Sequence, residues 1–407
     1  MSKKKVIETP KKMGIHVLSN AAWAPSGYGV QARLFMPRLQ KLGYQMSMTA
    51  FYGLQGHTLN MDGYVVFPQG YHPYGLDVAS NNCRMSGADI LLTNMDAWVI
   101  EPQMIDMTNW VPWFPVDSEP LAPAIESRVK QSFERIVYSK FAIEQCEKAG
   151  LSTEYIPMAV DTKAFFPADR KAALELLNAH IPVQIPQDNF VVSMVAMNKG
   201  NPSRKAFIQN IRAFKELHLK HPDTVLYLHT GKSDNGEMGG IPLTDYITEL
   251  GLTDCVFFPE LAIMINGYPD DFMNAIYNTS DVLLACTMGE GFGIPIVEAQ
   301  SAGCPVIVGD WTSMPELCFS GWKVDKKDTQ EYRTFLGNYM YSPNWQAIYE
   351  KLELAYDAKD NKAMRDLARK GALAYDADLV TEKYWKPVME KIEAKLRDRP
   401  KFIEAKK

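Results

Sequence analysis

The feature that most constrains the fold is a double series of short apolar segments, with amphipathic helical patterns such as residues 30–43 and 123–134 between them. The first series comprises residues 14–19, 44–52, 64–68, 88–94, 110–117, 135–139 and 154–161, and the second comprises 190–198, 224–231, 255–260, 281–287 and 304–309. Such alternation predicts an α/β protein whose parallel sheets are covered by helices on both faces.

The segment 161–188 interrupts the alternation with prolines and polar residues, and 407 residues are more than one ordinary core accommodates. We therefore predict two doubly wound, Rossmann-like domains, residues 1–170 and 171–380, with only helices after about residue 340. Ligands of such sheets bind beyond the carboxyl ends of the strands, so we predict a site in a cleft between the domains.

Composition excludes few functions. The net charge is -5, the six cysteines are scattered, and no apolar run is long enough to cross a bilayer. The N-terminus has lysines without an apolar stretch behind them, which is not typical of a secretory signal. We expect a cytoplasmic protein with reduced thiols, and neither the cysteines nor the seven histidines are grouped as metal ligands.

The stretch MGEGFGIPIVEAQSAGCPVIVG, residues 288–309, predicts a ligand site. It follows an apolar strand, and Pro295 is suited to the first turn of the next helix. Glu290 then lies on the loop and Glu298 about one turn inside the helix. The glycines at 289, 291 and 293 allow positive φ and close approach to a ligand, and the helix start favours a phosphate. Carboxylates beside a phosphate suggest a sugar linked to a nucleoside diphosphate.

EGFGIPIVEAQSAGCPVIV resembles the signature of retaining glycosyltransferases of family 4, which have the GT-B fold. The resemblance implies that Glu290 contacts the donor sugar and that Glu298 holds the ribose hydroxyls. It also implies backbone contacts to the donor from Gly291, Phe292, Gly293 and Ile294. In this fold the C-terminal helix, here 380–407, packs back on the first domain.

Two further loops resemble parts of the same family. Residues 197–211 follow the first strand of the second domain, where the family carries cations that neutralise the diphosphate. Arg204 and Lys205 are our candidates for these cations. Asn198 and Lys199 occupy the place where the family commonly has Arg. Residues 21–33 resemble the glycine-rich loop of the first domain, with Gly27, Tyr28 and Gly29 near the donor. This variant resembles phage and archaeal members.

Three acidic residues complete the predicted site. Asp96 and Asp117 each end a strand of the first domain; Asp117 stands in for a His that contacts the donor sugar in many family members. Both could instead be ordinary strand-end caps. Glu260 lies in the region where the family binds the nucleotide base.

The resemblance implies transfer of a hexose or pentose from a UDP- or GDP-linked donor by front-face attack, without a metal or cofactor in the chemistry. Aromatics of the first domain and basic residues near both termini suit a hydroxymethylated DNA base as acceptor, or an anionic membrane carrying a lipid acceptor. A polysaccharide or small-molecule acceptor and a non-catalytic nucleotide-sugar-binding protein remain alternatives. The sequence indicates neither the donor sugar, nor the linkage, nor the oligomeric state.

Overall fold

The computed structural model describes residues 12–182, 184–234, 239–260 and 267–398. An eight-stranded sheet of order β3-β4-β2-β1-β5-β6-β7-β8 occupies the first half of the chain. Its strands are β1 Gly14–Asn20, β2 Gln45–Tyr52, β3 Leu59–Met61, β4 Tyr64–Phe67, β5 Ile90–Asn94, β6 Trp110–Phe114, β7 Ile136–Val137 and β8 Glu154–Tyr155. Its helices are α1 Gly27–Lys41, α2 Leu76–Met85, α3 Pro123–Val129 and α4 Lys140–Lys148.

A six-stranded sheet of order β11-β10-β9-β12-β13-β14 follows, and all its strand pairs are parallel. Its strands are β9 Phe190–Val195, β10 Thr224–His229, β11 Val256–Phe257, β12 Val282–Ala285, β13 Val306–Gly309 and β14 Gly321–Val324. The helices of this half are α5 Arg170–Asn178, α6 Phe207–Lys220, α7 Leu243–Glu249, α9 Asp270–Thr279, α10 Ile294–Ser301, α11 Trp345–Asp357 and α12 Lys362–Ala372. Both sheets thus contain the doubly wound strand order.

Burial on both faces explains the apolar strands. All seven residues of β1 are buried, including His16, whose ring nitrogens lie 2.8 Å from the hydroxyls of Ser47 and Thr49. Burial lowers the pKa of His16 to about 3, so this histidine is a neutral core residue.

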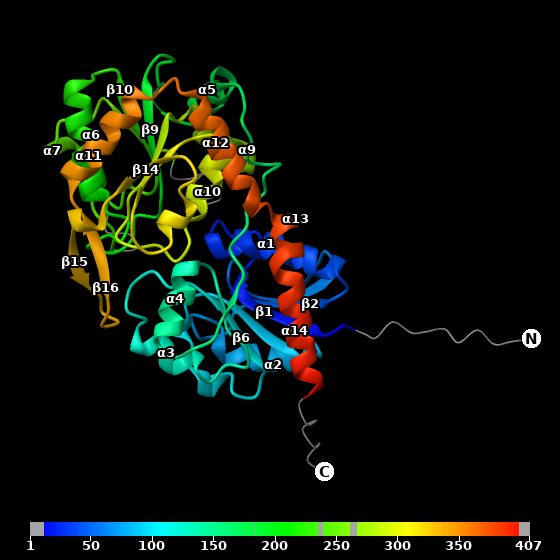
Figure 1. The fold of residues 1–407 in the computed structure, drawn as a ribbon. Helices are drawn as coiled ribbons and strands as arrows, with labels where there is room; N and C mark the ends of the chain where they lie inside the picture. The colour runs from blue at the N-terminus through cyan, green and yellow to red at the C-terminus, as the bar shows by residue number, and fades with distance from the viewer. Residues whose placement is uncertain (1–11, 183, 235–238, 261–266, 399–407) are drawn as a thin grey trace, which may run out of the picture.

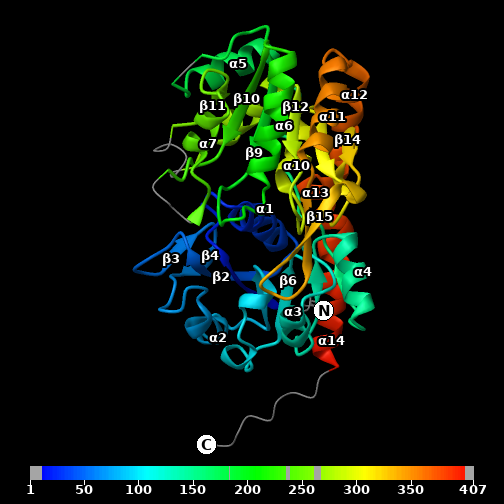
Figure 2. The ribbon, with the colours of Figure 1, turned by 90° about the vertical axis from the view of Figure 1, so that its left-hand side faces the viewer.

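The C-terminal segment returns to the first domain, as the fold prediction required. Helices α13 (Ala377–Val380) and α14 (Lys386–Arg397) run down beside the first sheet (Figures 1 and 2). The ring of Trp385 packs against Phe35 and Trp113, and Glu393 accepts a 2.9 Å hydrogen bond from the backbone N–H of Met13.

Several predicted elements differ in the structure. The strands expected at 135–139, 154–161 and 255–260 contain only two residues each, and β3 pairs antiparallel with β4. The sequence analysis missed β14 and an antiparallel hairpin, β15 (Thr329–Arg333) with β16 (Tyr339–Pro343). The expectation of helices only after about residue 340 was therefore wrong at β16. Half-exposed, polar strands such as TQEYR lack the apolar run that predicts a strand.

The missed hairpin links the two domains (Figure 2). Tyr339 and Glu119 exchange backbone hydrogen bonds of 2.8 and 3.0 Å, and the rings of Phe335 and Trp98 meet edge to face at 5.2 Å. The buried side-chain amide of Asn338 donates to Ser118 Oγ at 2.7 Å and to the carbonyl of Pro120 at 3.1 Å. The second domain is thus anchored on the segment that follows β6.

Replacing Asn338 with alanine leaves the buried hydroxyl of Ser118 and the carbonyl of Pro120 without their donor. We expect Asn338→Ala to lower the free energy of unfolding by about 1–3 kcal/mol in urea denaturation. The control, Asn81→Ala on the exposed side of α2, should change it by less than about 0.5 kcal/mol. Equal effects of the two substitutions would contradict this role of Asn338.

Candidate functional site

The loop between β12 and α10 touches the end of β6 from the other domain. A Cβ added at Gly289 would overlap the carbonyl oxygen of Asp117, and one added at Gly291 would overlap Pro115. Neither glycine has a positive φ, whereas Gly293 has φ +114° and caps α10. Of the three glycines, only Gly293 adopts the positive φ that a glycine allows. Gly289 and Gly291 are required for the close approach of the two domains.

Two cations of the second domain meet Glu290 at this contact. Arg204 Nη1 lies 3.0 Å and Lys205 Nζ 2.5 Å from the carboxylate of Glu290. Arg204 also lies 3.7 Å from Asp117 and donates to the carbonyl of Gly289. The structure thus brings together Glu290, Arg204, Lys205 and Asp117, which the sequence analysis had taken from separate segments.

The charges of this cluster determine the ionisation of Glu290. Burial would raise its pKa, since the residue is only 7% exposed, but Arg204 and Lys205 outweigh burial and lower the pKa to about 2. Burial and the neighbouring Arg204 lower the pKa of Lys205, whereas Glu290 and Asp117 outweigh burial and raise that of Arg204. Glu290 is therefore a carboxylate at any pH above about 4.

The sequence analysis missed the residues that hold the Glu290 loop. Thr312 Oγ1 accepts the backbone N–H of Glu290 at 3.1 Å, and Ser313 Oγ donates to the carbonyls of Glu290 and Phe292, at 2.7 Å each. Thr312 has a positive φ of 54°. The hydroxyl pair directly after β13 was the available signal, because that strand neighbours the one preceding the loop.

Glu298 has a different environment from Glu290. It lies in α10, is 8% exposed and accepts a 2.8 Å hydrogen bond from the hydroxyl of Tyr277. Burial raises the pKa of Glu298 to about 7; Tyr277 and Arg33 oppose the rise, and Asp270 adds to it. Arg33 of α1 pairs with Asp270 at 3.0 Å, so this part of the site also joins the two domains.

The loop before α1 lies against the start of α10. A Cβ added at Gly27 would be 3.3 Å from the side chain of Ile294, so Gly27 faces the other domain. The backbone N–H of Gly29 donates to the N-cap Ser26 at 3.1 Å and is engaged within its own helix. The donor contact predicted for Gly29 stays a prediction.

Tyr28 and Asp96 form a half-buried pair beside the cluster. The hydroxyl of Tyr28 donates to Asp96 at 3.1 Å. Burial and, after it, the negative charge of Asp117 raise the pKa of Asp96, although Tyr28, Arg204 and Lys199 act in the opposite direction. Asp96 and Asp117 thus interact electrostatically, rather than serving only as separate strand-end caps.

Two residues of the predicted donor site have other surroundings. The side-chain amide of Asn198 is satisfied by the backbone of its own domain: it accepts from the N–H of Ile241 at 3.0 Å and donates to the carbonyl of Ile241 at 2.7 Å. It therefore supports this loop, and its predicted contact with a donor stays a prediction. Glu260 is exposed and ends the described segment after β11, apart from the acidic cluster.

Within the described ranges, no three His, Cys, Asp or Glu residues are placed to hold a metal ion. No helix in those ranges is long and apolar enough to cross a membrane. His229 packs against Tyr268 at 5.2 Å, and burial lowers its pKa to about 4.

Comparison with known proteins agrees with this geometry. Residues 191–337 match the family model of glycosyl transferases group 1. The chain is 25% identical over 195 residues to MMP alpha-(1->4)-mannosyltransferase of Mycolicibacterium hassiacum, covering 46% of this chain and 39% of that protein. It is 28% identical over 223 residues to a GDP-mannose-dependent mannosyltransferase of Mycolicibacterium smegmatis, covering 51% of this chain and 52% of that one. The matched region thus spans about half or less of these relatives.

Solved structures match nearly the whole chain. Sucrose-phosphate synthase from Thermosynechococcus elongatus superposes with a TM-score of 0.68 at 15% identity, over 95% of this chain and 98% of that one. Anabaena HepE, crystallised with UDP and glucose, gives a TM-score of 0.63 at 16% identity, over 95% and 100%. The chain therefore has the two-domain GT-B fold of glycosyltransferases, which confirms the predicted fold class.

The raised pKa of Glu298 makes stability depend on pH. The unfolded chain releases this proton near pH 4.5 and the folded protein near pH 7, so folding is favoured at low pH. We expect the wild-type free energy of unfolding to fall by up to about 3 kcal/mol more than that of Glu298→Gln as pH rises from 4.5 to 7. Chemical denaturation at several pH values measures this difference.

Glu147→Gln, an exposed substitution on α4, is the matched control and should keep the wild-type pH dependence. The depressed pKa of Glu290 acts only below pH 4.5 and so lies outside this window. Parallel pH curves for the wild type and Glu298→Gln would contradict the raised pKa.

Proposed function

We propose that the protein transfers a sugar from a nucleoside-diphosphate sugar to an acceptor hydroxyl. The observation that carries this proposal is the meeting of Arg204 and Lys205 with Glu290 where the carboxyl ends of the two sheets meet. A diphosphate needs cations, and the side chain of Arg204 is 37% exposed and that of Lys205 22%. Glu298, eight residues further along the chain, is a buried acceptor for ribose hydroxyls.

The ion pairs suggest how the donor engages. The diphosphate takes over Arg204 and Lys205, and the carboxylate of Glu290 then accepts hydrogen bonds from hydroxyls of the donor sugar. Hydroxyls that donate to this carboxylate then take the place of the cations in stabilising its negative charge. Gly291, Phe292, Gly293 and Ile294 stay the predicted backbone contacts of the donor.

We propose front-face attack with retention at the anomeric carbon. The bond between the anomeric carbon and the diphosphate breaks, and its electron pair leaves with the diphosphate. The acceptor oxygen forms the new bond on the same face, and its proton passes to the departing phosphate oxygen. Arg204 and Lys205 stabilise the negative charge that develops on the leaving group, so no metal is needed in this scheme.

Two donors are the first to test. HepE, which shares this fold, was crystallised with UDP-glucose, and the Mycolicibacterium smegmatis relative is GDP-mannose-dependent. The names of several relatives, such as D-inositol 3-phosphate glycosyltransferase, indicate hydroxyl-rich acceptors. We therefore place a saccharide or polyol before the hydroxymethylated DNA base as acceptor.

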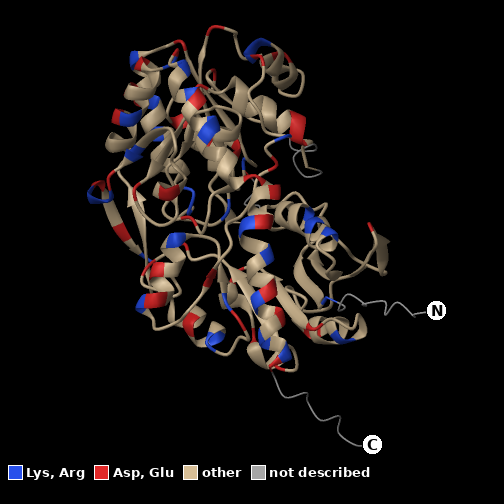
Figure 3. Cartoon of the chain, turned by 45° about the vertical axis from the view of Figure 1, so that its right-hand side comes forward, with Lys and Arg blue, Asp and Glu red and all other residues tan. Residues whose placement is uncertain are grey.

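The charge distribution favours the same order. Acidic and basic residues are interspersed over both domains in Figure 3, rather than gathered into the basic stripe that nucleic-acid binding needs. The basic tails that suggested DNA or a membrane lie mostly in residues 1–11 and 399–407, outside the described residues. A DNA acceptor and a lipid acceptor remain candidates for the assay.

The test measures release of nucleoside diphosphate from UDP- and GDP-sugars, with saccharides, polyols, lipids and hydroxymethylated DNA as acceptors. We expect Arg204→Ala to lower kcat by roughly a hundredfold or more, since one group that stabilises a developing oxyanion contributes that much. Glu298→Ala should raise the KM for the donor, because it removes the proposed ribose contact.

Arg84→Ala, an exposed substitution on α2, is the matched control and should retain wild-type activity. A wild-type kcat for Arg204→Ala together with a wild-type donor KM for Glu298→Ala would show that the site is assigned wrongly. Donor binding without release for any acceptor would favour a nucleotide-sugar-binding protein.

A further inference from the structure

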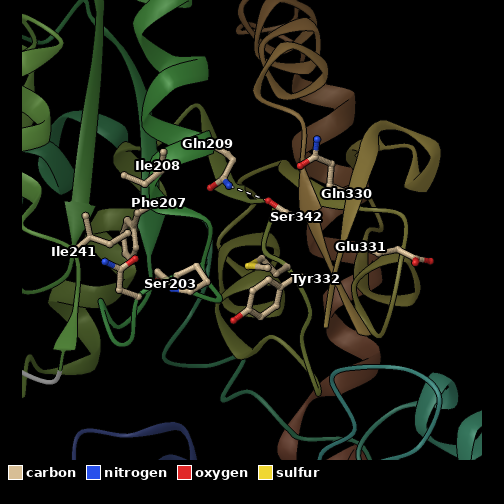
Figure 4. A pocket seen from close by; sticks show the side chains of 12 residues that line it. Ser203, Phe207, Ile208, Gln209, Ile241, Gln330, Glu331, Tyr332 and Ser342 are labelled. Atoms are coloured by element: carbon tan, nitrogen blue, oxygen red, sulfur yellow. Dashed lines mark hydrogen bonds between the residues drawn. The ribbon is translucent and has the colours of Figure 1, made fainter. Parts of the chain in front are cut away.

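A pocket of about 260 Å³ lies in the second domain, between the segment that carries Arg204 and the hairpin β15–β16 (Figure 4). Residues 201–203 and the start of α6 line one wall, and β15 with Ser342 of β16 lines the other. Met288, two residues before Glu290, also lines it. The volume fits a ligand of about one ring, since pockets for larger ligands start at roughly 300 Å³.

The lining combines an aromatic ring with neutral hydrogen-bonding groups. Tyr332 is 40% exposed, and both Tyr332 and Met288 line the pocket (Figure 4). The amide of Gln209 donates to the hydroxyl of Ser342 at 2.9 Å across the pocket. Ser203 is 3% exposed, and among the described residues its buried Oγ has no hydrogen-bond partner. A sugar ring requires an aromatic face against which its C–H groups can pack. It also requires hydroxyl and amide groups that form hydrogen bonds with its own hydroxyls.

The pocket offers a phosphate no cationic side chain. No Lys, Arg or His is among its lining residues, and its one ionisable acid is Glu331. In Figure 4 the side chain of Glu331 points away from Tyr332. Arg204 and Lys205 instead contact Glu290, which does not line the pocket. The donor diphosphate and an occupant of this pocket would therefore occupy separate places.

The pocket is connected to the proposed reaction centre by short backbone links. Ser203 directly precedes Arg204, and the backbone N–H of Met288 donates to the carbonyl of Arg204 at 2.8 Å. The carbonyl of Met288 accepts from the N–H of Tyr341 at 2.9 Å, which joins the hairpin to the same segment. The hairpin wall itself is anchored on the first domain through Asn338. A ligand here is thus held between the cation segment and the interdomain hairpin.

We propose that this pocket binds one neutral sugar ring of a saccharide acceptor, stacked on Tyr332 and hydrogen-bonded by Gln209. Only the assignment of the bound saccharide as an acceptor rests on the proposed function. The saccharide site itself is inferred from the pocket alone. A neutral saccharide, rather than a nucleic acid, is the substrate class, because the pocket offers no cation to a phosphate backbone.

The experiment compares Tyr332→Ala and Gln209→Ala with Tyr71→Ala, a matched substitution at a fully exposed tyrosine of the first domain. Binding of maltose, methyl α-glucoside, methyl α-mannoside and myo-inositol is measured by ligand-observed NMR without donor, with a short single-stranded oligonucleotide in parallel. We expect at least one neutral sugar to bind the wild-type protein. Tyr332→Ala should raise the Kd for that sugar roughly tenfold or more. Tyr71→Ala should leave that Kd unchanged.

Donor affinity, measured separately by calorimetry with UDP-glucose and GDP-mannose, should stay within roughly twofold in all three variants. The proposal is overturned if no sugar of the panel binds, if Tyr332→Ala and Tyr71→Ala act alike, or if only the oligonucleotide binds in a Tyr332-dependent way. Sugar binding that depends on Tyr332, without nucleoside diphosphate release from any donor, would support the pocket and contradict the proposed transferase function. The two hypotheses therefore fail in different measurements.

Discussion

The contact of Gly289 and Gly291 with the end of β6 is the constraint on which the site depends. A side chain at either glycine would overlap Asp117 or Pro115, so the two domains could not approach as they do. Because they do approach, Arg204 reaches both Glu290 of its own domain and Asp117 of the other. The same atoms thus link the packing of the domains to the arrangement of charge.

The two glutamates of the motif are tuned in opposite directions by their neighbours. Both are nearly buried, which alone would raise both pKa values. Two cations adjoin Glu290 and hold it charged, whereas Glu298 has mainly the hydroxyl of Tyr277 beside it, with Arg33 opposing Asp270. A fixed negative charge suits the proposed contact with a donor sugar. A carboxyl group that titrates near neutrality suits exchange of its proton for ribose hydroxyls.

The hairpin adds a second connection between the domains and one wall of the pocket beside Arg204. Its polar strands pair with each other, and Asn338 and Tyr339 at its end bond to residues 118–120. Three segments, 115–120, 203–205 and 288–291, thus form the interdomain contact, the Glu290 loop and part of the pocket wall between them. Domain closure that excludes water is a known means of limiting donor hydrolysis, and this shared framework is suited to it.

The sequence by itself determined the architecture and the principal charged groups. Apolar runs and helical periodicity depend on local burial, so they predicted both doubly wound sheets. The loop after β12 and helix α10 were predicted from the preceding strand, the glycines, Pro295 and the spacing of Glu290 and Glu298. Tertiary structure alone decided which atoms these groups meet. Gly289 and Gly291 face another domain, Asn198 is engaged by Ile241, and Thr312 and Ser313 hold the Glu290 loop. These partners lie tens to well over a hundred positions away in the chain, and the polar hairpin is stabilised by its docking. Local patterns carry no information about such contacts, because their energy arises only when distant segments pack together.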